Sequence, residues 1–363
     1  MRFVLTLLGE ITEYNSVMIA GFLPMNCQNC HGQEIIYTKL YKSNKCHCYF
    51  LENIKGIGMR VLVTGGAGFI GSNLIDKLLG KGVFVRVLDD FSTGKHSNLP
   101  IKNTQLEVVE GSVADAALVD QCAEGVDAIV HLAAVASVQA SVDEPVETHK
   151  TNFDGTLNVL EAARKNRVER VIYASSAAIY GDTEVLPVVE STPKKPMTPY
   201  AADKLAGEYY LDFYHRQFGL KYCAFRFFNI YGPRQDPNSP YSGVISIFTS
   251  RISQNKPIII YGDGEQTRDF VFVKDLVKIL TAAIDKPDLS AHVVNVGSGR
   301  STSLNEMIQA IETAAGKSVE KSFSKARAGD IRHSLSSPET LKELVGILPD
   351  TPLSEGITSL IDV

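Results

Sequence analysis

The segment VLVTGGAGFIGSNL, residues 61–74, decides the fold that we expect for this chain. It follows a short apolar run, precedes a helical pattern, and spaces Gly65, Gly68 and Gly71 three residues apart. In a strand–loop–helix unit, the first glycine permits a tight turn and the second lets a pyrophosphate approach backbone N–H groups. The third glycine lets the helix pack close to the strand, and the helix N-terminus favours the phosphate charge. The segment therefore predicts a dinucleotide-binding loop.

An acidic residue after the second apolar run supports this interpretation. Asp89 stands near the end of VRVLDD, residues 85–90. A carboxylate at this place can bind both ribose hydroxyls and repels a 2′-phosphate. We therefore expect NAD, rather than NADP, as the cofactor. The alternative is a glycine-rich turn that holds no ligand, with Asp89 as a solvated strand end.

Short apolar runs alternate with helical patterns from Met59 onward, which predicts alternating strands and helices. Strands are expected at 60–64, 84–88, 128–132, 170–174 and 222–227, and helices at 70–80, 152–164 and 200–218. Buried strands that alternate with helices are typical of a parallel, doubly wound sheet. We therefore expect an α/β protein with a Rossmann fold.

The regular alternation weakens beyond Tyr231, where prolines become frequent. This change indicates a smaller C-terminal domain that covers the first domain. We expect an NAD-binding Rossmann domain at 59–232 and a substrate-binding domain at 233–363, interleaved with each other. No clear period runs through residues 1–58, which form an uncharacterised N-terminal extension.

The extension contains four of the six cysteines: Cys27, Cys30, Cys46 and Cys48. Four thiolates could bind zinc, and Cys30 with His31 completes a formal C-x-x-C-H haem motif. Haem attachment needs an export context that the sequence does not show, and the C-x-C spacing is tight for a zinc site. We expect a disordered extension or an upstream translation artefact, and no metal site.

Composition and charge narrow the class of partner. The chain has 363 residues, 44% of them hydrophobic, and a formal net charge of -5. That balance does not favour nucleic acid as a partner. No apolar run approaches the roughly 20 residues of a membrane span, and no cleavage site follows the first residues. We therefore expect a cytoplasmic protein with reduced thiols that binds neither nucleic acid nor membrane.

The segment PYAADKLAGE, residues 199–208, is the candidate catalytic element. Tyr200 and Lys204 are four residues apart and so share one face of a helix. A tyrosine with a pKa of about 10 is a poor base at neutral pH, but a lysine ammonium and an oxidised nicotinamide would lower that pKa. Ser176 directly follows an expected strand, where parallel sheets bind ligands, and can hydrogen-bond the same substrate hydroxyl. Together they predict a proton acceptor beside a hydride acceptor.

These residues together resemble the extended short-chain dehydrogenase/reductase family, and within it the UDP-glucose and UDP-N-acetylglucosamine 4-epimerases. The resemblance covers the chain from about Met59 to its end. It is carried by TGGAGFIGSNL, HLAA at 131–134, TNFDGTLNVLEAA at 151–163, SSAAIYGD at 175–182, PYAADK, FRFFNIYGPRQDP at 225–237 and YGDGEQTRDFVFVKD at 261–275.

The resemblance implies a role for each matching residue. NAD would be bound by Gly65, Gly68, Phe69, Ile70, Gly71, Asp89, Leu132, Ala133, Ala134 and Asn152, with Tyr200 and Lys204. Catalysis would fall to Ser176, Tyr200 and Lys204. The UDP-sugar would be bound by Ser176, Asn229, Arg268, Arg327, Asp330 and Ser334, with Asn229 on a phosphate and the arginines and Asp330 on the UDP group. The resemblance also implies a homodimer.

The implied reaction is a 4-epimerisation without net redox change. Tyr200 takes the proton of the sugar 4-hydroxyl, NAD takes the C4 hydride, and the 4-keto sugar turns before the hydride returns. Family members that eliminate water or carbon dioxide carry an acid beside the serine, where this chain has Ala177 and Ala178. The alternatives are a uronate 4-epimerase, a dehydratase, or a non-catalytic NAD-binding protein.

Ser334, in ARAGDIRHSLSS at 326–337, falls where the epimerases limit room at the sugar C2. A tyrosine there excludes an N-acetyl group in the family, and a small residue admits it. The resemblance therefore implies UDP-GlcNAc and UDP-GalNAc as substrates, alongside UDP-Glc and UDP-Gal. The alternative is a loop serine, with other residues setting the pocket.

Overall fold

The structure is a computed structural model that describes residues 18–22, 36–42, 45–49, 58–237, 243–286, 288–326 and 331–361. The chain divides into two units, Met1–Gly58 and Met59–Val363. No helix in these described ranges has the length and apolar character needed to cross a membrane.

The first unit contains a three-stranded antiparallel sheet in the order β1-β2-β3. Its strands are β1 (Met18–Phe22), β2 (Ile36–Lys42) and β3 (Lys45–Tyr49). The sequence shows no clear period here, so these strands differ from the disordered extension that we expected. Cys46 and Cys48 lie in β3, whereas Cys27, Cys30 and His31 lie outside the described residues.

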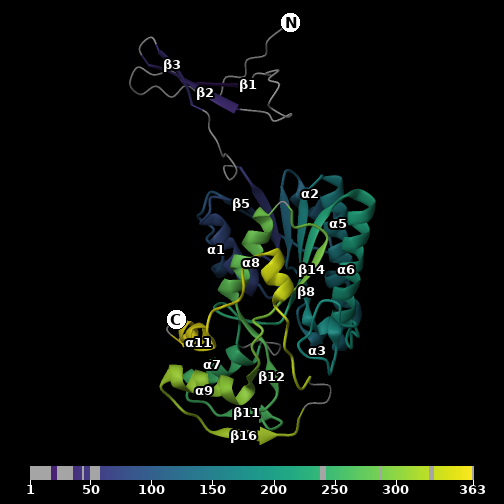
Figure 1. The fold of residues 1–363 in the computed structure, drawn as a ribbon, viewed down its shortest axis with the longest axis vertical. Coiled ribbons are helices and arrows are strands. Elements are labelled where there is room, and N and C mark those ends of the chain that lie inside the picture. Colours follow the sequence, from purple (N-terminus) through teal and green to yellow (C-terminus); the bar gives the residue numbers. More distant parts are fainter. Residues whose placement is uncertain are drawn as a thin grey trace. The chain divides into compact units, whose positions relative to one another are not determined.

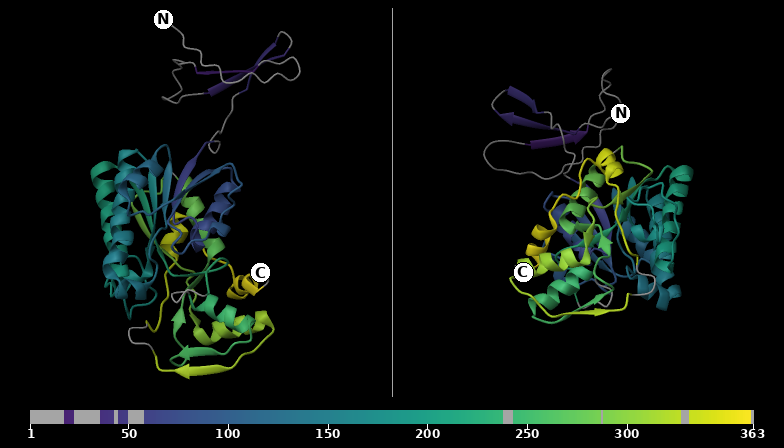
Figure 2. Two further views of the ribbon diagram at one scale, coloured as in Figure 1. Left: turned by 180° about the vertical axis from the view of Figure 1, so that it is seen from behind. Right: turned by 60° about the horizontal axis from the view of Figure 1, so that its bottom comes forward.

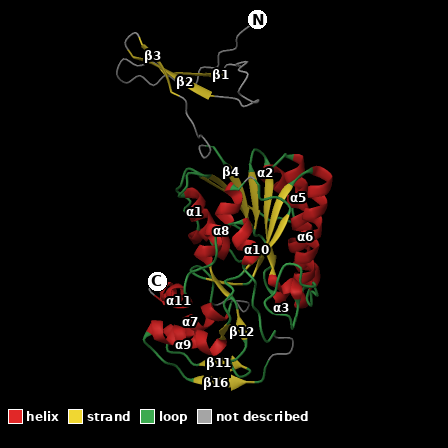
Figure 3. Cartoon of the chain, viewed as in Figure 1, coloured by secondary structure: helices red, strands yellow, loops and turns green. Residues whose placement is uncertain are grey.

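The second unit is built on a seven-stranded sheet, drawn in yellow in Figure 3. Its strand order is β14-β9-β8-β7-β4-β5-β6. All its neighbouring strands are parallel. The strands are β4 (Arg60–Thr64), β5 (Phe84–Asp89), β6 (Leu106–Glu110), β7 (Ala128–His131), β8 (Arg170–Ser176), β9 (Lys221–Phe227) and β14 (His292–Val296). The chain runs from β4 outward to β6, then returns to β7 on the other side. The strand order therefore reverses between β4 and β7, where such sheets bind ligands beyond the strand carboxyl ends.

Helices cover both faces of this sheet (Figure 1). One face is covered by α1 (Phe69–Leu79), α8 (Val273–Asp285) and α10 (Glu339–Leu344), and the other by α2 (Ala116–Ala123), α5 (Gly155–Lys165) and α6 (Pro199–Phe218). Val61 and Val63 pack with the α1 and α8 side, and Leu62 packs with the α5 and α6 side. This alternation follows from the period of two along a strand.

A smaller layer with its own apolar core lies beyond the carboxyl ends of the strands. Its helices are α7 (Val244–Ser253), α9 (Leu304–Ala315) and α11 (Leu353–Ile361). Three two-stranded sheets complete it: β10 (Asn229–Tyr231) with β13 (Phe270–Phe272), β11 (Ile258–Tyr261) with β16 (Lys321–Ser324), and β12 (Thr267–Arg268) with β15 (Thr302–Ser303).

The chain after residue 233 contributes to both layers. In Figure 2, its green and yellow segments run through the smaller layer and also beside the seven-stranded sheet. β14 pairs with β9 in that sheet, and α8 packs against α1. The division of the unit at residue 232 stays a prediction.

The strands expected at 60–64, 84–88, 128–132, 170–174 and 222–227 are confirmed by β4, β5, β7, β8 and β9. The helices expected at 70–80 and 200–218 are confirmed by α1 and α6. The helix expected at 152–164 begins instead as a π-helical turn, η2 (Lys150–Asp154), and continues as α5. The remaining short helices are η1 (His96–Asn98), α3 (Val138–Asp143), α4 (Pro145–His149) and η3 (Ala177–Tyr180).

A buried ion pair joins α6 to the sheet. The guanidinium of Arg226 in β9 donates through Nε and Nη2 to the two carboxylate oxygens of Glu208 in α6, at 2.9 and 2.7 Å. Each side chain is only 4% exposed. Ser175, at the end of β8, donates to the same carboxylate at 2.5 Å. This cluster fixes α6 against the carboxyl ends of β8 and β9.

Glu208→Ala is expected to lower the free energy of unfolding by about 3–5 kcal/mol, because it leaves the Arg226 guanidinium buried without its carboxylate. Asp212→Ala is the matched control on the same helix. Asp212 pairs with Arg216 at 2.8 Å, but both side chains are largely exposed, so its loss should cost less than about 1 kcal/mol. Denaturant unfolding followed by circular dichroism measures both values. Equal losses in the two variants would contradict the role given to the pair.

Candidate active site

The glycine loop lies between β4 and α1, at the point where the strand order reverses. Gly65 has a φ of +70°, and its N–H donates to the carbonyl of Leu88 at 2.8 Å. A Cβ on Gly65 would lie 2.7 Å from the backbone nitrogen of Ala133, and one on Gly71 would lie 2.3 Å from the carbonyl oxygen of Gly65. The loop thus tolerates no side chain at either position.

The N-terminus of α1 faces this loop without a capping side chain. Gly68 occupies the N-cap, and Phe69 and Ile70 form the first turn. Helix N-termini carry unsatisfied N–H groups and a positive dipole end, which suit a phosphate. The cradle that a Cβ would fill and the uncapped helix therefore fit the pyrophosphate of a dinucleotide.

Asp89 ends β5 beside the loop and is 7% exposed. Its Oδ2 accepts from the backbone N–H of Ala67 at 2.8 Å, and its Oδ1 accepts from that of Phe91 at 2.9 Å. Burial raises the pKa of Asp89, and these two hydrogen bonds oppose the rise. Each carboxylate oxygen can accept a further bond, so the group fits ribose hydroxyls while it also fixes the loop.

The residues after β7 form the other wall of this region. Leu132, Ala133 and Ala134 continue from β7, and the backbone N–H of Ala133 donates to Thr64 Oγ1 at 3.3 Å. Asn152, buried in η2, accepts from the backbone N–H of Val135 at 2.8 Å. Single π-helical turns are frequent at functional sites. Here the turn lets Asn152 hold the loop that follows β7.

The three candidate catalytic residues come from two elements that meet. Tyr200 and Lys204 lie on α6, Ser176 ends β8, and the side chain of Ser176 lies close enough to Tyr200 to lower the pKa of its phenol. The Nζ of Lys204 lies 5.9 Å from the ring centroid of Tyr200 and 5.0 Å from that of Tyr173. Burial lowers the pKa of Lys204 to about 8, and the charge of Asp203 opposes that fall.

Burial dominates the electrostatics that the protein's own groups give Tyr200. It raises the pKa of Tyr200, and the interaction with Ser176 only partly offsets this. The lowering of this pKa by Lys204 together with an oxidised nicotinamide stays a prediction. The ammonium lies beside the phenol ring at 5.9 Å from its centroid, and the protein interior penalises a phenolate. The protein's own groups therefore do not make Tyr200 a base at neutral pH.

Sequence reasoning missed a buried histidine, His131, that supports the site. The ring nitrogens of His131, at the end of β7, lie 2.7 Å from Thr64 Oγ1 and 3.0 Å from Thr156 Oγ1. Burial, reinforced by the charge of Lys204, lowers the pKa of His131 to about 3. His131 is therefore neutral and links β4, β7 and α5. Its place in HLAA was visible in the sequence, but its partners were not.

Two cavities lie in this part of the structure, and one of them is lined by a candidate catalytic residue. The first, of about 480 Å³, includes Ser176, and the second, of about 430 Å³, lies in the smaller layer. Asn229 and Arg268 line both cavities, so they mark the place where the two meet. This arrangement would fit a ligand that places one end in each cavity and an anionic group between them, beside Arg268.

The predicted substrate residues are only partly brought together. Asn229 and Arg268 lie at the junction, and Ser334 lines the first cavity. Arg327 and Asp330 lie outside the described residues. The second cavity is lined mainly by apolar side chains, among them Val244, Ile247, Phe248, Ile259, Phe270 and Leu304.

Gln266 adds a polar group to the second cavity that the sequence did not single out. Its Nε2 donates to the carbonyl of Tyr261 at 2.8 Å. Its Oε1 is buried and accepts no hydrogen bond from the described part of the chain. Buried acceptors are normally paired, so this oxygen fits a donor on a bound molecule.

Comparisons with known proteins agree with this geometry. The profile of the NAD dependent epimerase/dehydratase family matches residues 61–297. A UDP-glucose 4-epimerase of Mycolicibacterium smegmatis is 40% identical over 308 residues, which cover 84% of this chain and 98% of that protein.

Two solved structures are similar over the same region. The UDP-N-acetylglucosamine 4-epimerase from Methanobrevibacter ruminantium, in complex with UDP-N-acetylmuramic acid, has a TM-score of 0.80 and 37% identity. The Thermus thermophilus UDP-glucose 4-epimerase, in complex with NAD, has a TM-score of 0.77 and 38% identity. Each match covers 84% of this chain and 98% of the solved chain.

Gly71→Ala is expected to weaken NAD binding about 5- to 150-fold, because its Cβ would meet the carbonyl oxygen of Gly65 and force apart the loop and α1 (roughly 1–3 kcal/mol for overpacking). Gly80→Ala, just past the other end of α1, is the control. Gly80 has helical φ and ψ, so alanine fits there and NAD affinity should stay unchanged. Titration calorimetry with NAD measures both. Equal affinities for Gly71→Ala and the wild type would remove the loop from cofactor binding.

Proposed function

The chain belongs to the NAD-dependent epimerase/dehydratase family, and from this premise we propose that it epimerises UDP-hexoses at C4 through a 4-keto sugar. The proposed substrates are UDP-GlcNAc and UDP-GalNAc, and also UDP-Glc and UDP-Gal. One observation carries the proposal: the cavity that includes Ser176, beside Tyr200, continues through Asn229 and Arg268 into a second, mostly apolar cavity. The sugar would occupy the first cavity, the diphosphate the junction at Asn229 and Arg268, and the uracil the second cavity.

NAD fits the glycine loop, the uncapped end of α1 and Asp89. When bound, it supplies a hydride acceptor that takes and returns hydrogen at the sugar C4. Gly65, Gly68 and Gly71 would admit its pyrophosphate, with Phe69 and Ile70 in the adjoining turn. Asp89 would accept from its ribose, and Leu132, Ala133 and Ala134 would line its path, with Asn152 fixing that loop.

Tyr200 is proposed as the acid–base group and Ser176 as its hydrogen-bonding partner. Because burial raises the pKa of Tyr200, a phenolate needs more positive charge than the protein interior around it provides. Lys204 contributes an ammonium, and an oxidised nicotinamide carries a second positive charge. The base would therefore form only in the loaded site, where its proton transfer is useful.

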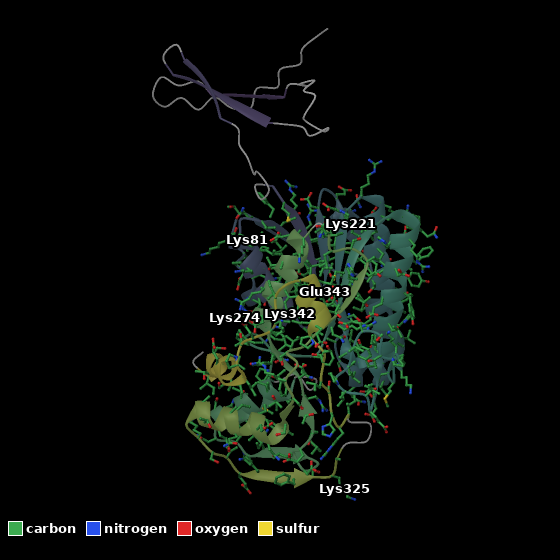
Figure 4. The ribbon with its side chains drawn as sticks, in the orientation of Figure 1. Lys81, Lys221, Lys274, Lys325, Lys342 and Glu343 are labelled. Atoms are coloured by element: carbon green, nitrogen blue, oxygen red, sulfur yellow. The ribbon has the colours of Figure 1, made fainter. Side chains whose placement is uncertain are left out.

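The UDP group is proposed to span the junction of the cavities. Arg268 would bind the diphosphate, since a guanidinium fork matches phosphate oxygens, and Asn229 would donate beside it. The buried Oε1 of Gln266 would accept from uracil among the apolar side chains of the second cavity. Arg327 and Asp330 stay predicted UDP contacts. The labelled lysines Lys81 and Lys221 lie at one end of this unit and Lys325 at the other (Figure 4).

Epimerisation is favoured over elimination by the lining of the first cavity. Ala177 and Ala178 line it next to Ser176, and no carboxylate occurs among its described lining residues. Elimination from the 4-keto sugar needs a second acid–base group near C5 and C6. The described cavity offers room without that group, which suits a sugar that turns and accepts hydrogen back.

A homodimer in the cytoplasm is also proposed. Exposed apolar side chains gather on neighbouring helices, with Val142 on α3, Val146 on α4, and Tyr210 and Phe213 on α6. Exposed apolar patches commonly mark protein interfaces. Cys122 and Cys223, the cysteines whose side chains are described, are free and buried, which agrees with a reducing compartment.

The proposed activity is tested with UDP-sugars, NAD and product configuration read by NMR. UDP-GlcNAc and UDP-Glc should each give the galacto epimer without loss of water or carbon dioxide. Tyr200→Phe should lower kcat by about 10²–10⁴-fold, because it removes the proton acceptor, and leave NAD affinity nearly unchanged. Tyr209→Phe, an exposed tyrosine on the same helix, should keep wild-type turnover. A 4-keto-6-deoxy product, or full turnover by Tyr200→Phe, would refute the mechanism.

Ser334→Tyr tests substrate choice, because a phenol ring would fill the space that an N-acetyl group needs. The kcat/KM for UDP-GlcNAc should fall about 10- to 100-fold, the cost of overpacking by roughly 1–3 kcal/mol, while UDP-Glc turnover stays within a few-fold of wild type. Ser334→Ala keeps the cavity open and should retain both activities. If Ser334→Tyr epimerised both sugars as the wild type does, other residues would set the pocket.

A further inference from the structure

A buried carboxylate lies next to the catalytic lysine in the chain. Asp203 directly precedes Lys204 on α6, and its side chain is 8% exposed. Its Oδ1 lies 2.7 Å from Nδ1 of His149, the last residue of α4. Its Oδ2 is buried and accepts no hydrogen bond from any residue that the structure describes. A buried carboxylate with an unused oxygen is costly unless a positive charge nearby stabilises it.

Lys204 carries a positive charge that is also buried without an ion pair in the described part of the chain. Its side chain is buried among aromatic rings, with Nζ 5.0 Å from the centroid of Tyr173 and 5.9 Å from that of Tyr200. Within the described ranges it forms no ion pair. The ring faces stabilise a cation only modestly. Burial therefore lowers the pKa of Lys204 to about 8, and the charge of Asp203 acts in the opposite direction.

We propose that Asp203, held by His149, is the counter-ion that keeps the Lys204 ammonium charged beside Tyr200. Asp203 is a positioning residue, since it acts through Lys204 and not on the substrate. The proposal deepens the function proposed above and rests on it for its catalytic meaning. Its electrostatic content, the charge state of one lysine, is independent of turnover.

The neighbouring elements carry other charged and titratable groups, and the two nearest glutamates are paired with other residues. Glu208, one turn further along α6, is paired with Arg226 of β9. Glu147 of α4 is paired with Lys150 of η2, and both are exposed. The remaining groups on the packed elements are Asp143 on α3, Asp154 on η2, Glu161, Arg164 and Lys165 on α5, Arg170 and Tyr173 on β8, Tyr180 on η3, and Lys221, Tyr222 and Cys223 on β9. His131 on β7 also lies within reach of the charge of Lys204. Among all the acids of α6 and these elements, Asp203 is the one whose charge raises the pKa of Lys204.

His149 holds this carboxylate from α4, because its Nδ1 lies 2.7 Å from Oδ1 of Asp203. Its own side chain is 50% exposed, so a substitution at His149 can change the charge beside Asp203 from the solvent side.

Direct titration of Lys204 tests the proposal in the full chain. Protein labelled with ¹³C at the lysine Cε is titrated by NMR, and Lys204→Arg identifies its signal. Asp203→Asn should lower the titration midpoint from about 8 by roughly one pH unit, because an opposite charge is removed. The charged fraction at pH 8 would then fall roughly fivefold. An unchanged midpoint in Asp203→Asn would overturn the proposal.

Two further variants separate charge from structure. His149→Lys keeps the Asp203 carboxylate but places a permanent positive charge against it, so the midpoint should fall in the same direction. Glu147→Gln removes a nearby exposed carboxylate already paired with Lys150 and should leave the midpoint unchanged. Size-exclusion chromatography checks that each variant keeps the wild-type assembly. Equal shifts of the Lys204 midpoint in Glu147→Gln and Asp203→Asn would show that any nearby negative charge has the same effect. The proposal that Asp203 is the counter-ion would then be rejected.

The pH profile of kcat distinguishes this proposal from the function on which it rests. The alkaline limb should move to lower pH in Asp203→Asn and His149→Lys, and stay in place in Glu147→Gln. If the wild type converts no UDP-sugar, the proposed function fails while the NMR titration still decides the counter-ion. If the wild type is active and the NMR midpoint of Asp203→Asn is unchanged, only the counter-ion fails.

Discussion

The contact between the end of β8 and helix α6 is the constraint on which the site depends. Ser176 comes from the sheet and Tyr200 from the helix, so their side chains interact only if the two elements are held in register. The buried pair of Glu208 and Arg226 supplies that restraint, and Ser175 joins it one residue before Ser176. A buried ion pair is weak evidence for stability, but it does specify geometry when every donor and acceptor is satisfied.

Burial favours the neutral form of both Tyr200 and Lys204. It raises the pKa of Tyr200 and lowers that of Lys204, so the protein interior disfavours both the phenolate and the ammonium. Such a site gains its charges from what enters it and from the few fixed ions around it. Under the proposed function, cofactor binding would then be coupled to the formation of the base, and an unloaded enzyme would hold a neutral phenol.

Local sequence patterns predicted those parts of the structure that depend on residues close together in the chain. The glycine loop, β4, α1 and the helix with Tyr200 and Lys204 each follow from spacing within about twenty residues. The edge strand β6 was missed because its residues are half exposed, and β14 because it returns to the sheet after the alternation has weakened. The partners of His131 and the pairing of His149 with Asp203, 54 residues away, could not be predicted, since they depend on how distant elements pack.

The two cavities differ in the side chains that line them, and this difference bears on how an epimerase of this shape could work. Ser176, Ala177, Ala178, Gly181 and Ser334 give the first cavity many small groups beside Tyr180, Phe227 and Phe228, whereas the second cavity has larger apolar side chains and none of these small residues. Binding energy from a remote part of a substrate can hold it while the reacting part stays free. A UDP group fixed in the second cavity and at Arg268 would keep the keto sugar from escaping. The small residues of the first cavity would then leave the sugar room to turn between the two hydrogen transfers.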